Sequence, residues 1–191
     1  MNDAQLDAAS ALKRRGALLE GHFRLSSGRH SDRFVQKFRI LEDPSTLDPV
    51  ARAIAERFRP ERPTIVVSAA VGGILLGYEV ARHLGVKAIF VEKEQGKPVL
   101  RRGFALSPSD RAVVVEDVVT TGLSVREVIN VVREHGAHVV GVGVMVMRAP
   151  IEFDSIAVHA LLDLPLRSYA PDECPQCRAG EPISDPGSRR A

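Results

Sequence analysis

The segment from Ala112 to Ser124 constrains the fold of this chain more than any other. It opens with four apolar residues, three of them valine, and such a β-branched run is typical of a strand covered on both faces. Beyond it, apolar residues return at helical spacing from Val125 to Val132. The segment therefore predicts a buried strand, a turn and a helix, the repeating unit of parallel α/β sheets.

The turn between this strand and helix is rich in hydroxyl groups, and two carboxylates precede it. At the start of a helix, backbone N–H groups and the helix dipole hold a phosphate well, and the turn residues are Thr120, Thr121, Gly122 and Ser124. Glu116 and Asp117 would repel a phosphate, but carboxylates accept hydrogen bonds from ribose hydroxyls and stabilise positive charge on the ring. The pattern predicts a ribose 5-phosphate site. The structural alternative is an acidic turn with one Ser or Thr helix cap.

Other apolar runs continue the alternation of strands and helices. A Gly-centred hairpin is predicted from Phe23 to Phe34, and a long charged loop over 92–108. Helices are predicted over 4–20, 44–58 and up to Leu84, and strands over 64–67, 86–91, 138–147 and 156–162. This order predicts an α/β fold with a doubly wound, mostly parallel sheet, whose ligands lie at the carboxyl ends of the strands.

A second candidate loop follows the strand at 64–67. Small residues there let the backbone approach a diphosphate and donate N–H groups, and they are Ala69, Ala70, Gly72 and Gly73. A Gly-Gly helix start is equally compatible with close packing alone. The segments 68–73, 92–103 and 116–124 each follow a strand, so we expect them to line one edge of the sheet.

Length and composition narrow the class of protein. A chain of 191 residues with 45% apolar and 26% charged residues is typical of one globular domain. Lys and Arg are scattered among the acidic residues and the net charge is only +2, so no nucleic-acid partner is expected. No apolar stretch has the length of a membrane span or a signal sequence, which predicts a cytoplasmic protein without a membrane partner. Walker and G-x-G-x-x-G motifs are missing, which disfavours ATPases and dinucleotide-dependent dehydrogenases.

The segment 112–124 resembles the phosphoribosyl-diphosphate (PRPP) motif of type I phosphoribosyltransferases, in which two acidic residues and a Thr/Gly loop follow a hydrophobic strand. The resemblance implies Mg²⁺ as cofactor and catalytic roles for Lys93, Asp117 and Glu116. It also implies a PRPP site made of Glu116, Asp117, Val118, Val119, Thr120, Thr121, Gly122, Leu123, Ser124, Lys93, Ala70, Val71 and Gly72.

The segment from Phe23 to Phe34 resembles the F-x-L-x-S-G-x-x-S-x-x-F/Y segment with which orotate phosphoribosyltransferases cap the base pocket. Arg148 matches the family arginine that pairs with the orotate carboxylate. The resemblance implies transfer of the 5-phosphoribosyl group from PRPP to orotate, giving orotidine 5′-phosphate and diphosphate in de novo UMP synthesis. Orotate would be bound by Thr120, Arg148 and Phe34.

The resemblance further implies a single phosphoribosyltransferase domain over 1–191, with an N-terminal hood (1–40), an α/β core (45–162) and an irregular tail (163–191). It implies a homodimer with shared active sites, in which Lys93 serves the neighbouring subunit. Two alternatives stay open. One is a phosphoribosyltransferase for another base, such as xanthine or a modified pyrimidine, and the other is a non-catalytic regulator that senses PRPP.

The chain departs from the family pattern at two places. The family loop usually reads Arg-Lys-Glu followed by a further Lys and His, whereas only Lys93 aligns here. Ser26 stands where the family usually has a lysine. Positive charge for the diphosphate could instead come from nearby residues, namely Lys97, Arg101 and Arg102.

Two cysteines, Cys174 and Cys177, form a C-P-Q-C motif in the Pro/Gly-rich tail. One such motif supplies at most two metal ligands, half of a structural zinc site. Three interpretations follow: two reduced thiols in a turn, a zinc ion shared by two subunits, or a disulfide or redox role.

Overall fold

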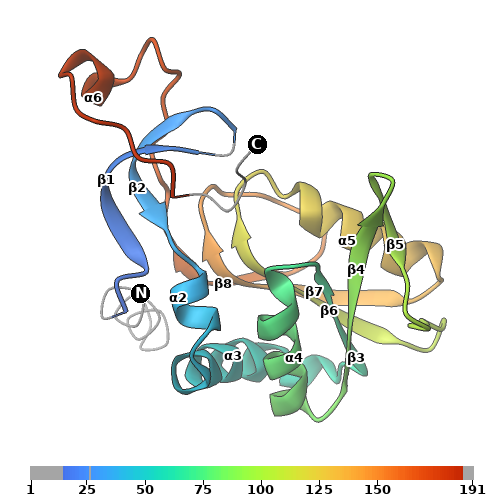
Figure 1. The fold of residues 1–191 in the computed structure, drawn as a ribbon. Coiled ribbons are helices and arrows are strands. Elements are labelled where there is room, and N and C mark those ends of the chain that lie inside the picture. The colour runs from blue at the N-terminus through green and yellow to red at the C-terminus, as the bar shows by residue number, and fades with distance from the viewer. Residues whose placement is uncertain (1–14, 26, 187–191) are drawn as a thin grey trace.

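The computed structural model describes residues 15–25 and 27–186, and its centre is a six-stranded sheet in the order β5-β4-β3-β6-β7-β8 (Figure 1). Neighbouring strands are parallel, except that β4 and β5 are antiparallel. The bounds are β3 (Ile65–Ala69), β4 (Lys87–Glu94), β5 (Lys97–Leu100), β6 (Arg111–Val119), β7 (His138–Met147) and β8 (Val158–Asp163). The predicted mostly parallel α/β fold is confirmed.

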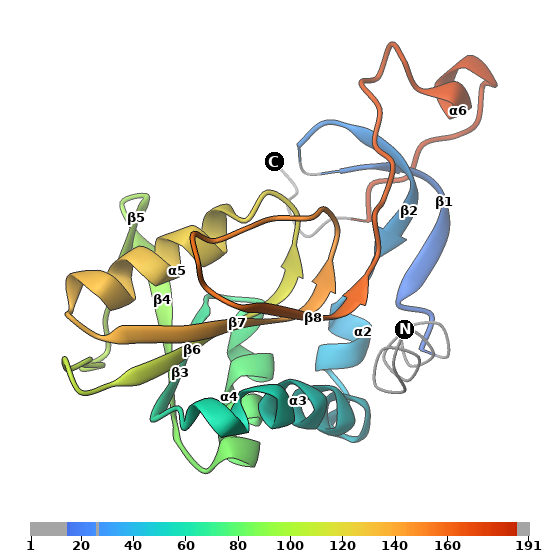
Figure 2. The same cartoon turned by 180° about the vertical axis from the view of Figure 1, so that it is seen from behind.

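Helices cover both faces of this sheet. α3 (Pro44–Phe58) and α4 (Gly73–Leu84) lie on one face and α5 (Leu123–Glu134) on the other (Figures 1 and 2). Alternate residues of β6 enter the two cores, with Val113 and Val115 facing α3 and α4, and Ala112 and Val114 facing α5. Burial on both sides explains why β6 begins as an unbroken apolar run.

Close packing of α3 on the sheet depends on a glycine. A Cβ atom at Gly141 of β7 would overlap the ring of Phe58, which is almost fully buried. The helix itself begins where the sequence predicts, since Asp43 accepts a hydrogen bond from Ser45 N and Pro44 occupies the first turn.

The hairpin β1 (Leu18–Arg24) and β2 (His30–Val35) forms a separate sheet that projects from the core together with the short α6 (Pro175–Arg178) (Figure 1). The chain after β8 returns to this hairpin, where His30 and Tyr169 exchange backbone hydrogen bonds. Ser184 pairs likewise with the opposite strand, donating to His22 O and accepting from Arg24 N. Two further short helices, α2 (Phe38–Leu41) and η1 (Arg59–Glu61), connect β2 to α3 and α3 to β3.

Two predicted elements differ in the structure. The helix predicted over 4–20 falls mostly on residues 1–14, outside the described residues, and its end is part of strand β1 because Leu18 and Leu19 pair with Val35 and Phe34. The first half of the loop predicted over 92–108 is a β-hairpin, and the prediction holds for the segment after Leu100. Gln95 and Gly96 both adopt positive φ (51° and 81°), which is the backbone of a tight hairpin turn, so β4 and β5 pair.

Within the described residues, none of the helices combines the length and the apolar character needed to cross a membrane.

Candidate active site at the carboxyl edge of the sheet

Two acidic residues lie buried near the end of the central strand β6. Glu116 is 7% exposed and Asp117 only 1%. They belong to the strand itself and do not follow it as predicted, because β6 keeps pairing with β7 up to Val119. Two of the carboxylate oxygens accept local backbone N–H groups, from Asp117 N to Glu116 Oε1 (3.1 Å) and from Val118 N to Asp117 Oδ1 (2.6 Å).

A lysine from the segment after β2 neutralises part of this charge. Lys37 Nζ lies 2.7 Å from Asp117 Oδ2 as an ion pair, although the alignment is not that of a hydrogen bond. Lys37 was not predicted as a site residue. Its only local signal is a single cation within the mostly apolar segment 34–38.

Burial dominates the protonation of Glu116. Loss of water, together with the neighbouring Asp117 carboxylate, raises the pKa of Glu116 to about 8. In the ligand-free protein at neutral pH this side chain is therefore largely protonated. Strong displacement of a pKa inside a cavity is typical of functional sites.

The acidic pair lines a cavity of about 720 Å³, within the range of small-molecule sites. Four separated segments meet there: the end of β2 with α2, the loop after β3, the end of β6 and the tail. The lining residues are Phe34, Val35, Gln36, Lys37, Phe38, Ala69, Ala70, Val71, Gly72, Glu116, Asp117, Val118, Ser124, Asp185 and Pro186. The structure thus places the predicted Ala70, Val71 and Gly72 beside the acidic pair.

The loop after β3 comes very close to that pair. A Cβ atom at Gly72 would overlap the Asp117 carboxylate, and it would lie 2.5 Å from Lys37 Nζ. The peptide bond between Ala70 and Val71 is cis. Gly72 is thus needed for the approach of this backbone, which makes the pattern of small residues more than a helix-packing device.

A second, small cavity of about 30 Å³ lies at the N-terminus of α5, and its lining includes Glu116 and Val118, Val119, Thr120, Thr121, Gly122, Leu123 and Ser124. Gly122 occupies the N-cap position with φ of 76°, and no side chain caps the helix. The alternative that the hydroxyls serve as a helix cap is therefore wrong. Backbone N–H groups of the first turn stay available for an anion.

The predicted orotate ligands are spread over this edge of the sheet. Phe34 lines the larger cavity and Thr120 the smaller one, whereas Arg148 lines neither. Arg148 follows β7, its backbone N–H donates to Val119 O (2.9 Å), and its buried Nε has no hydrogen-bond partner. Burial lowers the pKa of Arg148. A half-buried arginine whose Nε–H lacks a protein acceptor is suited to an anionic ligand.

Lys93 is not brought to the acidic pair of its own chain. It lies on β4, is about half exposed, and its Nζ is 2.8 Å from Glu127 Oε1 on α5. It lines neither of the two cavities. In the same hairpin Arg101 and Arg102 pair with Glu92.

Comparison with known proteins agrees with this geometry. The family model for the phosphoribosyl transferase domain matches residues 38–155. The orotate phosphoribosyltransferase of Pelotomaculum thermopropionicum is 45% identical over 185 residues, covering 96% of this chain and 97% of the relative. That of Thermotoga petrophila is 47% identical over 179 residues, covering 93% of this chain and 96% of the relative.

Solved structures are similar as well. The crystal structure of orotate phosphoribosyltransferase from Aeropyrum pernix has a TM-score of 0.69 at 29% identity, covering 81% of this chain and 92% of that one. The enzyme from Mycobacterium tuberculosis, in complex with Fe(III) dicitrate, has a TM-score of 0.72 at 25% identity, covering 83% and 95%. With its sequence and its fold both in agreement with these proteins, the chain belongs to the orotate phosphoribosyltransferases of the type I phosphoribosyltransferase family.

Proposed function

We propose that this chain transfers the 5-phosphoribosyl group from PRPP to orotate, giving orotidine 5′-phosphate and diphosphate. The observation that carries the proposal is the placement of Glu116 and Asp117 between the anion-binding turn at α5 and the cavity beneath the hairpin. A phosphorylated ribose spans such a site, with its phosphate at the turn and its hydroxyls at the carboxylates.

The chemistry follows from this placement. The turn Thr120–Ser124 anchors the 5-phosphate, so binding energy remote from the reacting carbon holds C1 in position for attack by the base. As the bond to diphosphate breaks, positive charge grows on the ribose ring, and the Asp117 carboxylate beside it stabilises that charge. The Ala70 N–H donates to Val91 O, so the backbone N–H groups of Val71 and Gly72, together with the Lys37 ammonium, would hold the departing diphosphate.

Carboxylate oxygens are also the ligands that suit Mg²⁺. Asp117 Oδ2 is buried and forms an ion pair with Lys37 Nζ (2.7 Å), and a carboxylate oxygen keeps a second lone pair for a ribose hydroxyl or a hydrated cation. Mg²⁺ prefers such oxygen ligands together with phosphate oxygens and water, so the acidic pair fits it. When bound, Mg²⁺ neutralises charge on the leaving diphosphate.

Enzyme assays with several bases decide among the remaining functions. We expect loss of orotate that depends on PRPP and Mg²⁺, with little turnover of xanthine, hypoxanthine or uracil. Asp117→Asn keeps the side-chain volume but removes the charge beside the ribose, so turnover should fall at least ~100-fold. A different preferred base would favour a phosphoribosyltransferase that acts on that base. PRPP binding without turnover of any base would favour a non-catalytic regulator that senses PRPP.

Arg148→Ala tests the base pocket. Removing a charged, bidentate partner of the orotate carboxylate should raise KM for orotate roughly tenfold or more and leave KM for PRPP within about twofold. Arg133→Ala is the matched control, because Arg133 is half exposed and pairs with Asp154 away from both cavities. Equal increases in both Michaelis constants would place Arg148 outside the base pocket.

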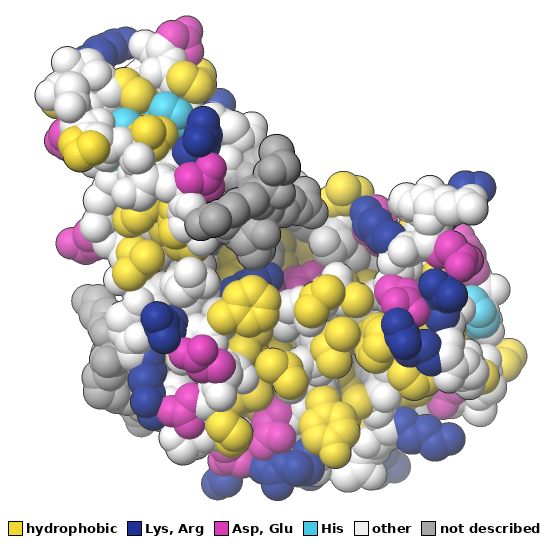
Figure 3. Space-filling model, in the orientation of Figure 1, with side chains coloured by type: hydrophobic (Ala, Val, Ile, Leu, Met, Phe, Trp, Pro, Cys, Tyr) yellow, Lys and Arg dark blue, Asp and Glu magenta, His cyan; other side chains and the backbone are white. Residues whose placement is uncertain are grey.

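We also propose a homodimer that buries an apolar patch beside the larger cavity. Exposed apolar side chains gather over α2 and α4, namely Phe38 (39% exposed), Val71 (75%), Leu75 (49%) and Tyr78 (65%), and Figure 3 shows a group of yellow side chains on this face. Phe38 and Val71 also line the cavity. Contiguous exposed apolar surface is typical of interaction sites, and a partner seated here would border the active site.

In that dimer Lys93 serves the partner's active site. Within its own chain Lys93 pairs with Glu127 and lies outside both cavities, while the β4–β5 hairpin that carries it extends from the core (Figure 1). A hairpin of this kind can reach across a two-fold axis.

Mixing two inactive variants tests the shared site. After subunit exchange between Asp117→Asn and Lys93→Ala chains, each heterodimer has one site with an intact pocket and an intact lysine. Random pairing restores about a quarter of wild-type activity, because half the dimers carry one working site of two. Exchange is verified with differently tagged chains. If exchange is complete and activity stays absent, Lys93 acts within its own subunit.

The buried acidic pair also makes stability depend on pH. The folded protein holds the Glu116 proton up to about pH 8, whereas the unfolded chain releases it near the ordinary value of 4.5. Between these values the unfolded state binds fewer protons, so stability falls as pH rises, and the contribution is complete below pH 4.5 and lost above pH 8.

Glu116→Gln removes this titration. We expect the melting temperature of the ligand-free variant, measured relative to that of wild type, to increase between pH 5 and pH 9. The increase should be roughly 2–4 °C or more, which corresponds to about 1 kcal/mol in the free energy of unfolding. Glu134→Gln, at an exposed position on α5, is the control and should follow wild type. Parallel curves for wild type and Glu116→Gln would contradict a raised Glu116 pKa.

A further inference from the structure

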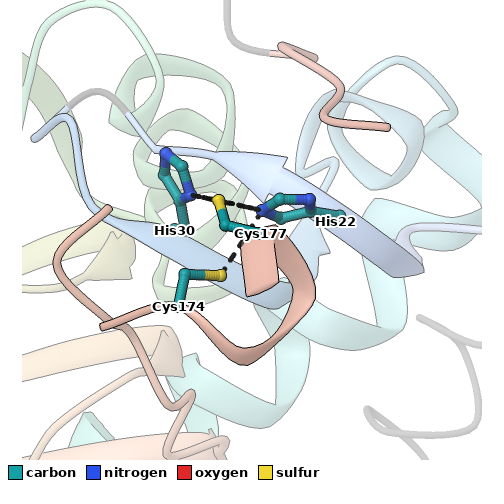
Figure 4. A group of neighbouring side chains, drawn as sticks. All are labelled: His22, His30, Cys174 and Cys177. Atoms are coloured by element: carbon teal, nitrogen blue, oxygen red, sulfur yellow. Dashed lines mark hydrogen bonds between the residues drawn. The ribbon is translucent and has the colours of Figure 1, made fainter. Parts of the chain in front are cut away.

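Four metal-binding side chains converge at the outer end of the projecting hairpin. His22 lies on β1, His30 on β2, and Cys174 and Cys177 flank the start of α6 (Figure 4). Their ligand atoms all lie within 4.8 Å of one another. The pairs are separated by up to 155 residues along the chain, so tertiary folding brings them together.

The distances match a tetrahedral ion site. His22 Nε2 lies 3.2 Å from His30 Nδ1, 3.4 Å from Cys174 Sγ and 3.6 Å from Cys177 Sγ. His30 Nδ1 is 3.2 Å from Cys177 Sγ. For zinc bonds of about 2.0–2.3 Å, the edges of a ligand tetrahedron are roughly 3.3–3.8 Å long.

Hydrogen bonds alone do not satisfy this cluster. His22 Nε2 has one in-plane position for a proton or a lone pair, yet three ligand atoms approach it. His22, His30 and Cys174 are at most 7% exposed, so these groups are shielded from bulk solvent. A single cation at the centre would satisfy all four groups at once.

The surroundings orient a ligand as well. His22 Nδ1 lies 3.0 Å from Glu181 O, and a carbonyl only accepts, so Nδ1 carries the proton. Nε2 is then left with its lone pair directed at the cluster. This contact from the other ring nitrogen is typical of histidines that bind metals.

From this geometry we propose that His22, His30, Cys174 and Cys177 of one chain bind a structural Zn²⁺ ion. Four protein ligands with two sulfurs and two imidazole nitrogens form a closed site without an open position for chemistry. A zinc ion shared between two subunits is not needed, because the two histidines complete the ligand set within a single chain.

The ion would fix the tail to the hairpin close to the proposed base pocket. Beyond Cys177 the tail pairs with β1 through Ser184, and Asp185 contacts Arg24 (3.2 Å). Asp185 and Phe34 both line the larger cavity. Zinc therefore holds together two of the segments that enclose that cavity, and this effect on catalysis rests on the proposed function whereas the metal site does not.

Metal analysis of the full-length protein tests the site. Protein purified without chelators should contain about one zinc per chain. Cys177→Ser and His30→Asn should each lower the zinc content below about a tenth of that value, and His138→Asn should not, because His138 is exposed at the start of β7. Zinc that is unaffected by His30→Asn would overturn the proposed ligand set.

Cobalt substitution covers the case in which the variants do not fold. Wild-type protein stripped with a chelator under reducing conditions is titrated with Co²⁺, and tetrahedral sulfur and nitrogen ligation gives intense visible bands with sulfur-to-cobalt charge transfer. The titration should end at about one Co²⁺ per chain. An end point of half that value would indicate an ion shared by two subunits. Absence of both zinc and cobalt binding, or a Cys174–Cys177 disulfide in the protein as isolated, would overturn the proposal.

Steady-state kinetics of the zinc-free and the zinc-bound enzyme then test whether the metal site affects catalysis. Stripped enzyme should show a higher KM for orotate, with KM for PRPP within about twofold, and zinc should reverse the change. Zinc bound to a protein that fails to turn over orotate would reject the proposed function and leave the metal site intact. Zinc bound without any kinetic effect would reject the link to the base pocket.

Discussion

The buried acidic pair at the end of β6 is the feature on which the rest of the site depends. Two adjacent carboxyl groups with almost no exposure are costly to bury, and the structure offsets this with local N–H donors, the Lys37 ammonium and a raised pKa at Glu116. Placing them required a central strand whose first half is apolar on both faces. The strand supplies rigidity, so the carboxylates are held without large loops.

Each neighbouring element approaches that pair for a physical reason. Gly72 lets the loop after β3 come into contact, and Gly122 turns the chain so that α5 begins without a side-chain cap. The turn before α5 and the loop after β3 thereby approach the same acidic pair from two neighbouring strands. The cation that pairs with Asp117 comes from a third segment, after β2, which also joins the hairpin to the core.

The projecting hairpin and the tail form a unit of their own. Backbone pairs of His30 with Tyr169 and of His22 with Ser184 tie the tail to both strands, and the four-residue cluster lies at its outer end. A two-stranded hairpin has little core and is marginally stable by itself. A bound ion would supply the stability that apolar packing does not.

Much of the fold could be read from the sequence because its signals are local. The valine-rich run of β6 and the apolar patterns of α3, α4 and α5 predicted the order of the core, and the residues after that run predicted the acidic pair with its hydroxyl-rich turn. The prediction of helix for the segment 18–20 was wrong. This segment is a strand because it pairs with β2, and a local sequence pattern does not report such a contact between distant segments.

Local sequence patterns were therefore sufficient for the parallel core and for the chemistry carried by adjacent residues on one strand and turn. Tertiary structure alone decided which distant residues share a site. Lys37 meets Asp117 across 80 positions of the chain, and His22 and His30 meet the two tail cysteines across still longer separations. The physical reason is that periodicity reports which face of an element is buried, whereas a metal cluster or an ion pair depends on where whole elements come to lie.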